Sequence, residues 1–287
     1  MKKFILFPLL GGLLLLSCKK ENVIVIGFTP SAETEKIATT VKPLEDILSK
    51  KLQIKVKSYL ATDYTSLIEA LGSNKVDVAF LPPFAYVLAN EKYKSEIILK
   101  ALRNGHAFYR SQFIVRKGTA KTLNDLKGKI WAYSDASSTS GYLFPKAYMI
   151  KNGINPDNFF KDRIQTGSHD NAILAVYNNE ADLATTFEGA ENRLIKEYKD
   201  IKDKIEVIAY TDSIPNDGIV VRSSMNNQLK EKIKNAFLEL NNDQYALKIL
   251  KEIYSWDGII SANDKDYDVV REVMKLLNIR WILKSLN

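Results

Sequence analysis

The chain has 287 residues, 46% of them hydrophobic and 26% charged, which is the composition of a globular protein and excludes a disordered polymer. One Cys and two His exclude a disulfide framework and a zinc cluster of the usual ligand spacing, so we expect no metal site. The 41 Lys and Arg and 34 Asp and Glu give a net charge of +7, but they are mixed along the chain, which indicates a solvated surface and no nucleic-acid partner.

Residues 1–17 have the anatomy of a secretory signal peptide. Lys2 and Lys3 precede an apolar run over residues 4–16, which ends at Ser17 and Cys18. The run is shorter than the ~20 residues that a membrane-spanning helix needs. We therefore expect a cleaved signal peptide and a protein that acts outside the cytoplasm.

The segment that ends this run, Leu15-Leu16-Ser17-Cys18, resembles the bacterial lipobox, whose cysteine receives a diacylglyceryl group and becomes the new N-terminus. Cys18 is the only cysteine in the chain. The alternative is a cysteine that merely ends a signal peptide. We expect Cys18 to be lipidated and residues 18–22 to form a short tether, because two or more acyl chains hold a protein durably on a membrane.

The rest of the chain alternates short apolar runs with helical patterns. Residues 23–28 are almost wholly apolar and end at Thr29-Pro30, as expected of a strand buried on both faces in an α/β sheet. Such alternation predicts mostly parallel sheets. The predicted strands are residues 23–28, 54–59, 76–81, 97–103, 112–115, 129–133, 163–165, 181–186, 205–210 and 218–221.

The helical patterns and the number of strands predict two lobes. Pro43 is expected to start or kink its helix, and the last 60 residues are predicted to be all helical. This many strands, at ~100 to 200 residues per domain, favour two lobes over one sheet. We expect lobe 1 to comprise residues 23–112 and 219–287 and lobe 2 residues 113–218, with crossings at residues 112–115 and 218–221 beside a cleft.

Hydroxyl side chains gather where the predicted strand at residues 129–133 leads into a helix. A helix N-terminus presents free N–H groups, and capping alone needs only one hydroxyl. The run Ser138, Thr139, Ser140 therefore predicts an anion cradle. His169, at the next junction of strand and helix, can donate to the same anion, although a histidine there is also commonly a cap or a surface residue.

Two carboxylates lie on the loop side of predicted strands, where α/β folds bind ligands. Asp217 precedes residues 218–221 and Glu188 follows residues 181–186; turn chemistry and helix capping are the alternatives. Ser138, His169 and Asp217 can be written as a catalytic trio, but no nucleophile elbow, P-loop or dinucleotide fingerprint is present. We therefore predict no catalytic residues and no cofactor.

These loops resemble those of the substrate-binding lipoproteins of ABC importers for phosphonate, phosphite and phosphate. Residues 138–145 are similar to the family's S-T-S-G-aromatic-L-x-P run. The resemblance implies the two-lobed type 2 periplasmic-binding-protein fold, an α/β fold of mixed sheets flanked by helices, with a cleft between the lobes and two crossing strands. It also implies a small phosphorus-containing anion as ligand and an ABC permease as partner, and we expect a monomer.

The resemblance also implies roles for single residues. Tyr64 and Tyr109 match ligand-contacting tyrosines, His169 matches the family histidine, and the start of the helix near Phe84 matches a further oxyanion donor. Asp217 resembles the aspartate that meets the ligand's polar tail, and Glu188 lies one residue before the glutamate of a member specialised for an aminoalkyl phosphonate. The implied ligand-binding set is Tyr64, Tyr109, Ser138, Thr139, Ser140, His169, Glu188 and Asp217.

Two free carboxylates would select among anions. A dianion beside Asp217 and Glu188 meets like charge unless the ligand brings a proton donor, which an aminoalkyl phosphonate and a protonated phosphate or phosphite do and sulfate does not. We therefore expect sulfate to be excluded. The alternative functions are a receptor or sensor for another small anion and an extracytoplasmic hydrolase of phosphorus esters.

Overall fold

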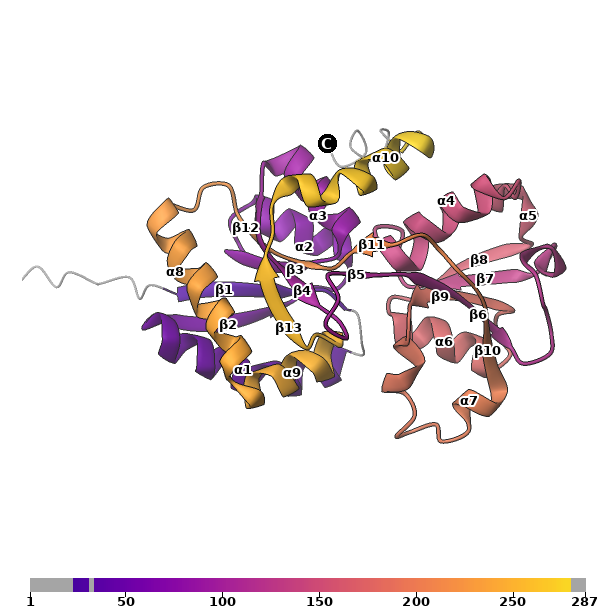
Figure 1. The fold of residues 1–287 in the computed structure, drawn as a ribbon, viewed down its shortest axis with the longest axis horizontal. Coiled ribbons are helices and arrows are strands. Elements are labelled where there is room, and N and C mark those ends of the chain that lie inside the picture. Colours follow the sequence, from indigo (N-terminus) through magenta and orange to yellow (C-terminus); the bar gives the residue numbers. More distant parts are fainter. Residues whose placement is uncertain (1–22, 31–33, 280–287) are drawn as a thin grey trace, which may run out of the picture.

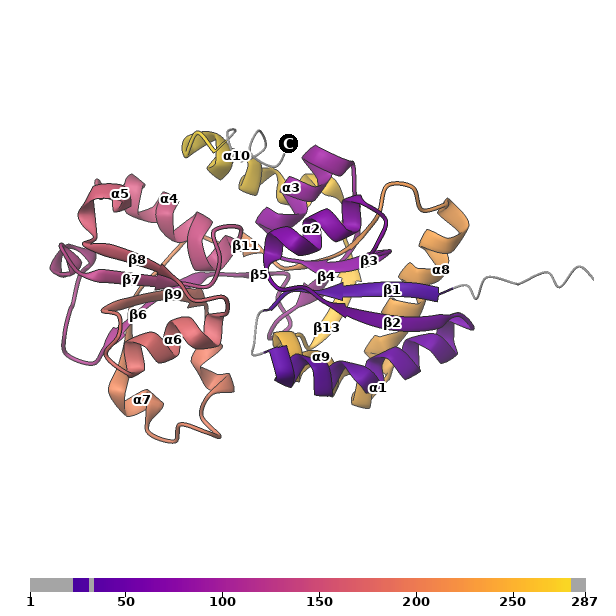
Figure 2. The ribbon, with the colours of Figure 1, turned by 180° about the vertical axis from the view of Figure 1, so that it is seen from behind.

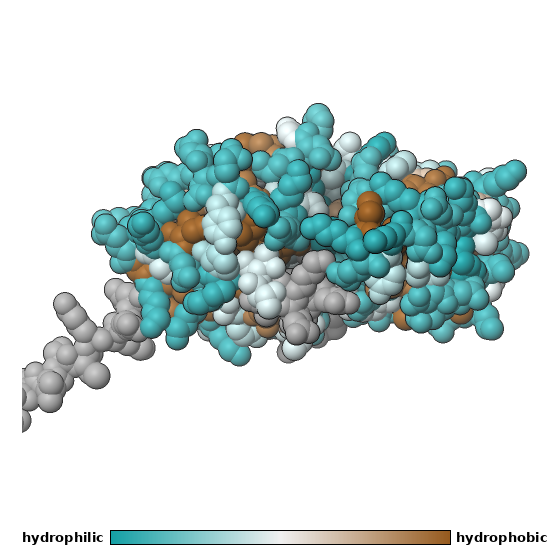
Figure 3. Space-filling model, turned by 90° about the horizontal axis from the view of Figure 1, so that it is seen from below, coloured by the Kyte–Doolittle hydropathy of each residue, from teal (hydrophilic) through white to brown (hydrophobic). Residues whose placement is uncertain are grey.

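The computed structural model describes residues 23–30 and 34–279. The predicted signal peptide, Cys18 and the tether at residues 18–22 lie outside this part of the chain. None of the helices in the described part is long and apolar enough to cross a membrane. Hydrophilic residues cover most of the face shown in Figure 3, in line with the solvated surface expected from the mixed charges.

The first of two large sheets has six strands in the order β13-β4-β12-β3-β1-β2. β1 pairs in parallel with β2 and β3, whereas β12 runs antiparallel to β3 and β4, and β13 antiparallel to β4. The carboxyl ends of β1 to β4 and the starts of β12 and β13 therefore meet at one edge. The strands are β1 (Val23–Phe28), β2 (Lys55–Leu60), β3 (Val78–Leu81), β4 (Glu96–Leu102), β12 (Gly218–Val221) and β13 (Gly258–Ser261).

Helices cover both faces of this sheet, and we call the whole unit the first lobe. A buried hydrophobic cluster lies on each face, because the central strands are apolar on both sides, and one of the two clusters continues into the second lobe. Figures 1 and 2 show α1, α8 and α9 on one face and α2, α3 and α10 on the other. The helices are α1 (Thr34–Leu52), α2 (Tyr64–Gly72), α3 (Pro83–Tyr93), α8 (Asn227–Leu238), α9 (Gln244–Tyr254) and α10 (Asp268–Leu276).

The second lobe is built on a sheet of five strands in the order β10-β6-β9-β7-β8. β7 is parallel to β8 and β9, and β6 is antiparallel to β9 and β10, so the ends of β7, β8 and β9 and the start of β6 share one edge. The strands are β6 (Ser111–Arg116), β7 (Ile130–Tyr133), β8 (Asp162–Gln165), β9 (Leu183–Phe187) and β10 (Ile205–Tyr210). The helices are α4 (Phe144–Lys151), α5 (Pro156–Phe159), α6 (His169–Tyr177) and α7 (Ile201–Lys204).

The chain passes between the lobes in a two-stranded antiparallel ribbon of β5 (Phe108–Tyr109) and β11 (Ile214–Pro215). Both views show this ribbon between the two sheets (Figures 1 and 2). The crossings predicted at residues 112–115 and 218–221 are therefore misplaced. Those residues lie inside β6 and β12, which pair with sheet neighbours along their length, so the crossings come just before each of them.

One of the two alternatives for Pro43 and one prediction for the C-terminal residues are wrong. Pro43 does not start a helix, because α1 begins at Thr34 and continues through it, with Val41 and Leu44 buried on either side. The last 60 residues are not all helical, because they contain β13. This strand pairs with β4, a partner more than 150 residues away, and its four residues are too few to show a period of their own.

Candidate functional site

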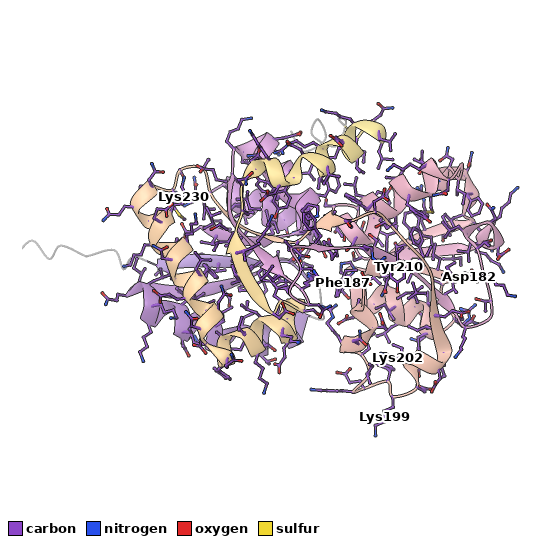
Figure 4. All side chains as sticks on the ribbon, viewed as in Figure 1. Asp182, Phe187, Lys199, Lys202, Tyr210 and Lys230 are labelled. Carbon is purple, nitrogen blue, oxygen red and sulfur yellow. The ribbon has the colours of Figure 1, made fainter. Side chains whose placement is uncertain are left out.

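A cavity lies where the loop edges of the two sheets face each other. Both lobes line it, as expected for a ligand site at the carboxyl ends of strands in α/β folds. Phe187, labelled in Figure 4, ends β9 where the second lobe faces the first. The lining residues are Thr29, Tyr64, Phe80, Leu81, Pro82, Arg103, Tyr109, Ser138, Ser140, His169, Phe187, Arg193, Asp217, Tyr254 and Trp256.

Hydroxyl groups from the loop after β7 line one side of this cavity. Ser138 caps a short π-helix, η2 (Thr139–Leu143), and its Oγ accepts a hydrogen bond from the Gly141 N–H at 3.0 Å. A Cβ on Gly141 would stand 2.8 Å from that Oγ, so only glycine lets the loop close this tightly. Ser140 is also buried. The structure thus places Ser138 and Ser140 at the cavity, and their role as an anion cradle stays a prediction.

Thr139 takes a different position from its two neighbours. Its Oγ1 accepts a hydrogen bond of 2.8 Å from the backbone N–H of Phe84, at the start of α3 in the first lobe. Thr139 is fully buried and does not line the cavity. The Thr139 hydroxyl, predicted as part of the anion cradle, and the Phe84 N–H, predicted as an oxyanion donor, therefore bind each other and connect the two lobes.

His169 is the first residue of α6, and its ring lies buried in the cavity wall. Nδ1 lies 2.9 Å from Oγ1 of Thr186. Burial, reinforced by the positive charges of Arg193 and Arg103, holds the pKa of the imidazole well below its usual value. The ring is therefore neutral, and when Nδ1 accepts the Thr186 proton, Nε2–H is a donor for a ligand.

Tyr64 and Tyr109 bring two buried phenols to the cavity from the first lobe and the ribbon. Burial raises the pKa of Tyr64, and the nearby carboxylates of Asp135 and Asp217 raise it further. Burial and Asp217 likewise raise the pKa of Tyr109. Both side chains therefore keep their O–H groups and can donate to an anion.

Asp217 is not a free carboxylate. Its Oδ2 accepts a hydrogen bond from Nη2 of Arg103, and the two side chains are only 13% and 10% exposed. Arg103 follows β4 and Asp217 precedes β12, so adjacent strands hold the pair together. The Arg103 guanidinium also lies over the rings of Tyr109 and Phe187, at 5.0 and 4.8 Å from their centroids.

Arg193 lies on the second-lobe side of the same cavity. It forms a buried ion pair with Asp170 and lies 4.9 Å from the centroid of the Phe187 ring. Neither Arg103 nor Arg193 was expected at the cavity from the sequence. For Arg103 a signal was present, because it ends a predicted apolar strand on the ligand side and precedes an Asn-Gly turn. Arg193 stands in a polar segment that gives no such signal.

Glu188 is not brought to the cavity. Glu188 directly follows Phe187, and it forms an ion pair with Arg110 through two hydrogen bonds, from Nη2 at 2.7 Å and from Nε at 3.0 Å. The side chains of Glu188 and Arg110 are 39% and 44% exposed. The expected exclusion of sulfate required two free carboxylates at the site. Asp217 is paired and Glu188 lies outside the cavity, so sulfate is no longer expected to be excluded on this ground.

The cavity does not assemble a catalytic triad from Ser138, His169 and Asp217. The serine caps η2, the histidine Nδ1 contacts Thr186, and the aspartate binds Arg103. A triad requires the aspartate to hold the histidine and the histidine to contact the serine. Nor do the described residues contain a cluster of three or more His, Cys, Asp or Glu placed to hold a metal.

Comparison with known proteins agrees with this fold and shows the family. The sequence profile described as "ABC transporter, phosphonate, periplasmic substrate-binding protein" matches residues 26–267. The phosphate-import protein PhnD of Mycolicibacterium smegmatis is 26% identical over 274 residues, which cover 88% of this chain and 85% of that protein. The phosphonates-binding periplasmic protein of Escherichia coli is 26% identical over 262 residues, covering 89% and 77%.

A solved structure is similar over the same extent. The binding-protein component of a phosphonate ABC transporter from Pseudomonas aeruginosa superposes with a TM-score of 0.81 at 26% identity, covering 88% of this chain and 85% of its own. The two-lobed type 2 fold expected from the sequence is therefore confirmed, and the family is one of binding proteins rather than enzymes. The chain belongs to the phosphonate family of periplasmic substrate-binding proteins of ABC transporters.

Proposed function

We propose that this protein captures a small phosphorus oxyanion, which is a phosphonate, phosphite or phosphate, outside the cytoplasm and delivers it to the permease of an ABC importer. One observation carries the proposal: the cavity between the lobes is lined by hydroxyl, phenol, imidazole and guanidinium groups that can all donate hydrogen bonds. An oxyanion supplies acceptors on every side. The relatives named for phosphate and phosphonates support the same ligand class.

Capture follows from how the donors are divided between the lobes. The Ser138 and Ser140 hydroxyls and the His169 ring hold the oxyanion from the second lobe, and Tyr64 closes over it from the first. Closure removes water from the site, which strengthens each charge-assisted hydrogen bond. Ligand binding thus shifts the population from open toward closed forms, and the permease recognises the closed form.

We infer that the lobes hinge at the ribbon of β5 and β11, which carries the chain from one sheet to the other. The first lobe then comprises β1–β4, β12 and β13 with their helices, and the second comprises β6–β10 with theirs. The boundaries drawn from the sequence, between residues 112 and 113 and between 218 and 219, would each divide a strand.

We also propose that Cys18 carries a lipid and that the protein works as a monomer on the outer face of a membrane. The lipobox-like segment before Cys18 supports the lipid. β1 begins at Val23, so the domain would stay close to the bilayer. Membrane fractionation tests this: Cys18→Ala should move the protein from the membrane to the soluble fraction, and an unchanged membrane fraction would contradict lipidation.

Isothermal titration of the purified protein tests the ligand class. Phosphate, phosphite, methylphosphonate, 2-aminoethylphosphonate and sulfate are titrated in turn, and a phosphate ester, p-nitrophenyl phosphate, is incubated separately with the protein and assayed for hydrolysis. We expect saturable binding of at least one phosphorus oxyanion without turnover. If none of the four phosphorus compounds binds, the proposal is contradicted. Product formation would favour the hydrolase alternative.

A further inference from the structure

The ligand cavity contains buried N–H groups without a hydrogen-bond partner. Nη2 of Arg103 binds Asp217, but Nε and Nη1 of the same guanidinium are buried and have no partner. The indole N–H of Trp256, a fully buried residue that lines the same cavity, also has none. Guanidinium and indole N–H groups can only donate. Because buried donors without acceptors are unfavourable, these N–H groups favour a ligand that brings acceptor atoms to this side of the cavity.

We propose that Arg103 is a specificity-determining ligand residue, whose Nε–H and Nη1–H bind a ligand oxygen and whose charge disfavours phosphonates that carry an ammonium group. This inference rests on the proposed function and names the ligand class more narrowly: a phosphorus oxyanion without an amino tail.

The charges around the cavity support this selection. The Asp217 carboxylate, which an ammonium would need, is already bound to Arg103. Glu188 lies outside the cavity in its pair with Arg110. Two further carboxylates lie close by: Asp170 is bound to Arg193, and Asp135, which does not line the cavity, accepts hydrogen bonds from the Ser137 N–H and the Gln165 side-chain amide. No carboxylate among the described residues that line the cavity is therefore left for a ligand cation.

The aromatic wall offers an ammonium no alternative contact at Phe187. Its ring already lies beside two guanidinium groups, that of Arg103 at 4.8 Å and that of Arg193 at 4.9 Å from the ring centroid. Rings attract cations through their faces, and here protein cations occupy those positions. An ammonium group in this part of the cavity would meet like charge.

The backbone fixes the position of Arg103. Arg103 and His106 exchange two backbone hydrogen bonds of 2.9 Å around Asn104-Gly105. Asn104 and Gly105 have φ values of 50° and 73°, as the tight type I′ turn requires, and this is where the glycine is needed. A planar guanidinium on a tight turn, held by Asp217 and two rings, is a pre-organised donor for an oxyanion.

Titration calorimetry on wild type and Arg103→Gln tests the inference. Three ligands lack an ammonium group, namely phosphate, phosphite and methylphosphonate, and 2-aminoethylphosphonate carries one. We expect wild type to bind its best ammonium-free ligand at least about tenfold tighter than 2-aminoethylphosphonate. In Arg103→Gln, the affinity for that ligand should fall about tenfold or more. The affinity for the amino compound should stay unchanged or rise, because Asp217 becomes free to accept its ammonium.

Arg110→Gln is the matched control, because it breaks the exposed pair with Glu188 and should leave both affinities within about twofold of wild type. Arg103→Lys keeps the charge but loses the fork of donors, so it should weaken the ammonium-free ligand and still disfavour the amino compound. A circular dichroism spectrum shows whether each variant folds.

The outcomes separate the inference from the proposed function. Wild type that prefers 2-aminoethylphosphonate, or an Arg103→Gln variant that weakens all ligands by one factor, overturns the role of Arg103 and leaves phosphorus-oxyanion binding standing. Wild type that binds none of the four ligands contradicts the proposed function itself. If neither variant at position 103 folds, the ligand preference of wild type still decides.

Discussion

The two faces of the ligand cavity differ in the kind of donor that they present. The second lobe presents neutral donors, the Ser138 and Ser140 hydroxyls and the His169 ring, which burial and nearby arginines keep uncharged; Arg193 beside them is bound to Asp170. The first lobe presents the Tyr64 phenol and a buried ion pair, Arg103 with Asp217, in which two N–H groups of the guanidinium have no partner. Neutral donors suit any tetrahedral oxyanion, whereas an ion pair distinguishes ligands by the charge of their remaining groups. Under the two proposals, capture and selection thus fall to different lobes.

Asp217→Asn should have the largest effect on stability, because it removes the negative charge of the buried Arg103–Asp217 ion pair and leaves the second-lobe donors unchanged. The Arg103 guanidinium would be left buried without a counter-charge, so the free energy of unfolding of the ligand-free protein should fall by about 3 kcal/mol. A bound oxyanion restores a counter-charge, so the ligand should raise the melting temperature more than in wild type.

Chemical denaturation and thermal melting measure both quantities. Glu188→Gln is the matched control on the exposed pair with Arg110 and should lower the free energy of unfolding by less than about 1 kcal/mol. Equal losses from the two substitutions would show that Asp217 and Arg103 are no more tightly coupled than the surface pair.

Ser140→Ala removes one of the neutral donors of the second lobe and should lower ligand affinity. A hydrogen bond to a charged group contributes about 1.5 to 3 kcal/mol, so every phosphorus oxyanion should bind roughly 10- to 150-fold more weakly in calorimetry. Ser73→Ala, which removes an exposed hydroxyl from the C-cap of α2, should leave the affinities unchanged. Loss of affinity for only one ligand would place Ser140 among the selecting groups instead.

His169→Gln should change how the stability of the protein depends on pH. The folded pKa of His169 lies below that of the unfolded chain, about 6.5, so below that pH the unfolded state binds more protons. The contribution of neutral His169 to stability is therefore complete above about pH 6.5 and declines as the pH falls, by at most about 1.4 kcal/mol per unit.

Urea denaturation between pH 5 and 7.5 tests this expectation. The pH dependence of the free energy of unfolding should be shallower in His169→Gln than in wild type. Ser73→Ala, an exposed substitution that changes no titratable group, provides the control and should keep the wild-type slope. Identical slopes for wild type and His169→Gln would mean that the ring is not held neutral in the folded protein.

Thr139→Val should have the smallest effect, because it acts on the contact between the faces. It removes the acceptor of the Phe84 N–H, and one neutral hydrogen bond contributes about 1 kcal/mol. All ligands should therefore bind about fivefold more weakly in calorimetry, by the same factor. Thr65→Val is the control: the Thr65 hydroxyl lies 3.5 Å from that of Ser137, and its removal should lower the affinities by less. A ligand-selective loss at Thr139 would assign it to the cavity.

The strands that the sequence predicted are those with an apolar run of their own. All ten predicted strands overlap an observed strand, from β1 to β12. The exceptions, β5, β11 and β13, have two to four residues and are defined by pairing with distant partners. Local periodicity carries no information about such pairings, so the ribbon and the last strand of the first lobe had to come from the structure.

The candidate site divides in a similar way. Ser138, Ser140 and His169 stand at junctions of strand and helix that the sequence pattern locates, and the structure places all three in the cavity. Arg103 and Asp217 are separated by more than 100 residues and meet only because β4 and β12 are neighbours. From its residue type alone, Asp217 was expected to be a free carboxylate. In the structure it is bound to Arg103, and this changes which ligand groups it can accept.

The most direct test of a divided site is a crystal structure of the protein with the phosphorus oxyanion that it binds most tightly. We expect one ligand oxygen within about 3.2 Å of the Ser138 or Ser140 hydroxyl and another within that distance of Nε or Nη1 of Arg103. A ligand held without Arg103, or one whose cationic tail lies against Asp217, would contradict the assignment of selection to the ion pair.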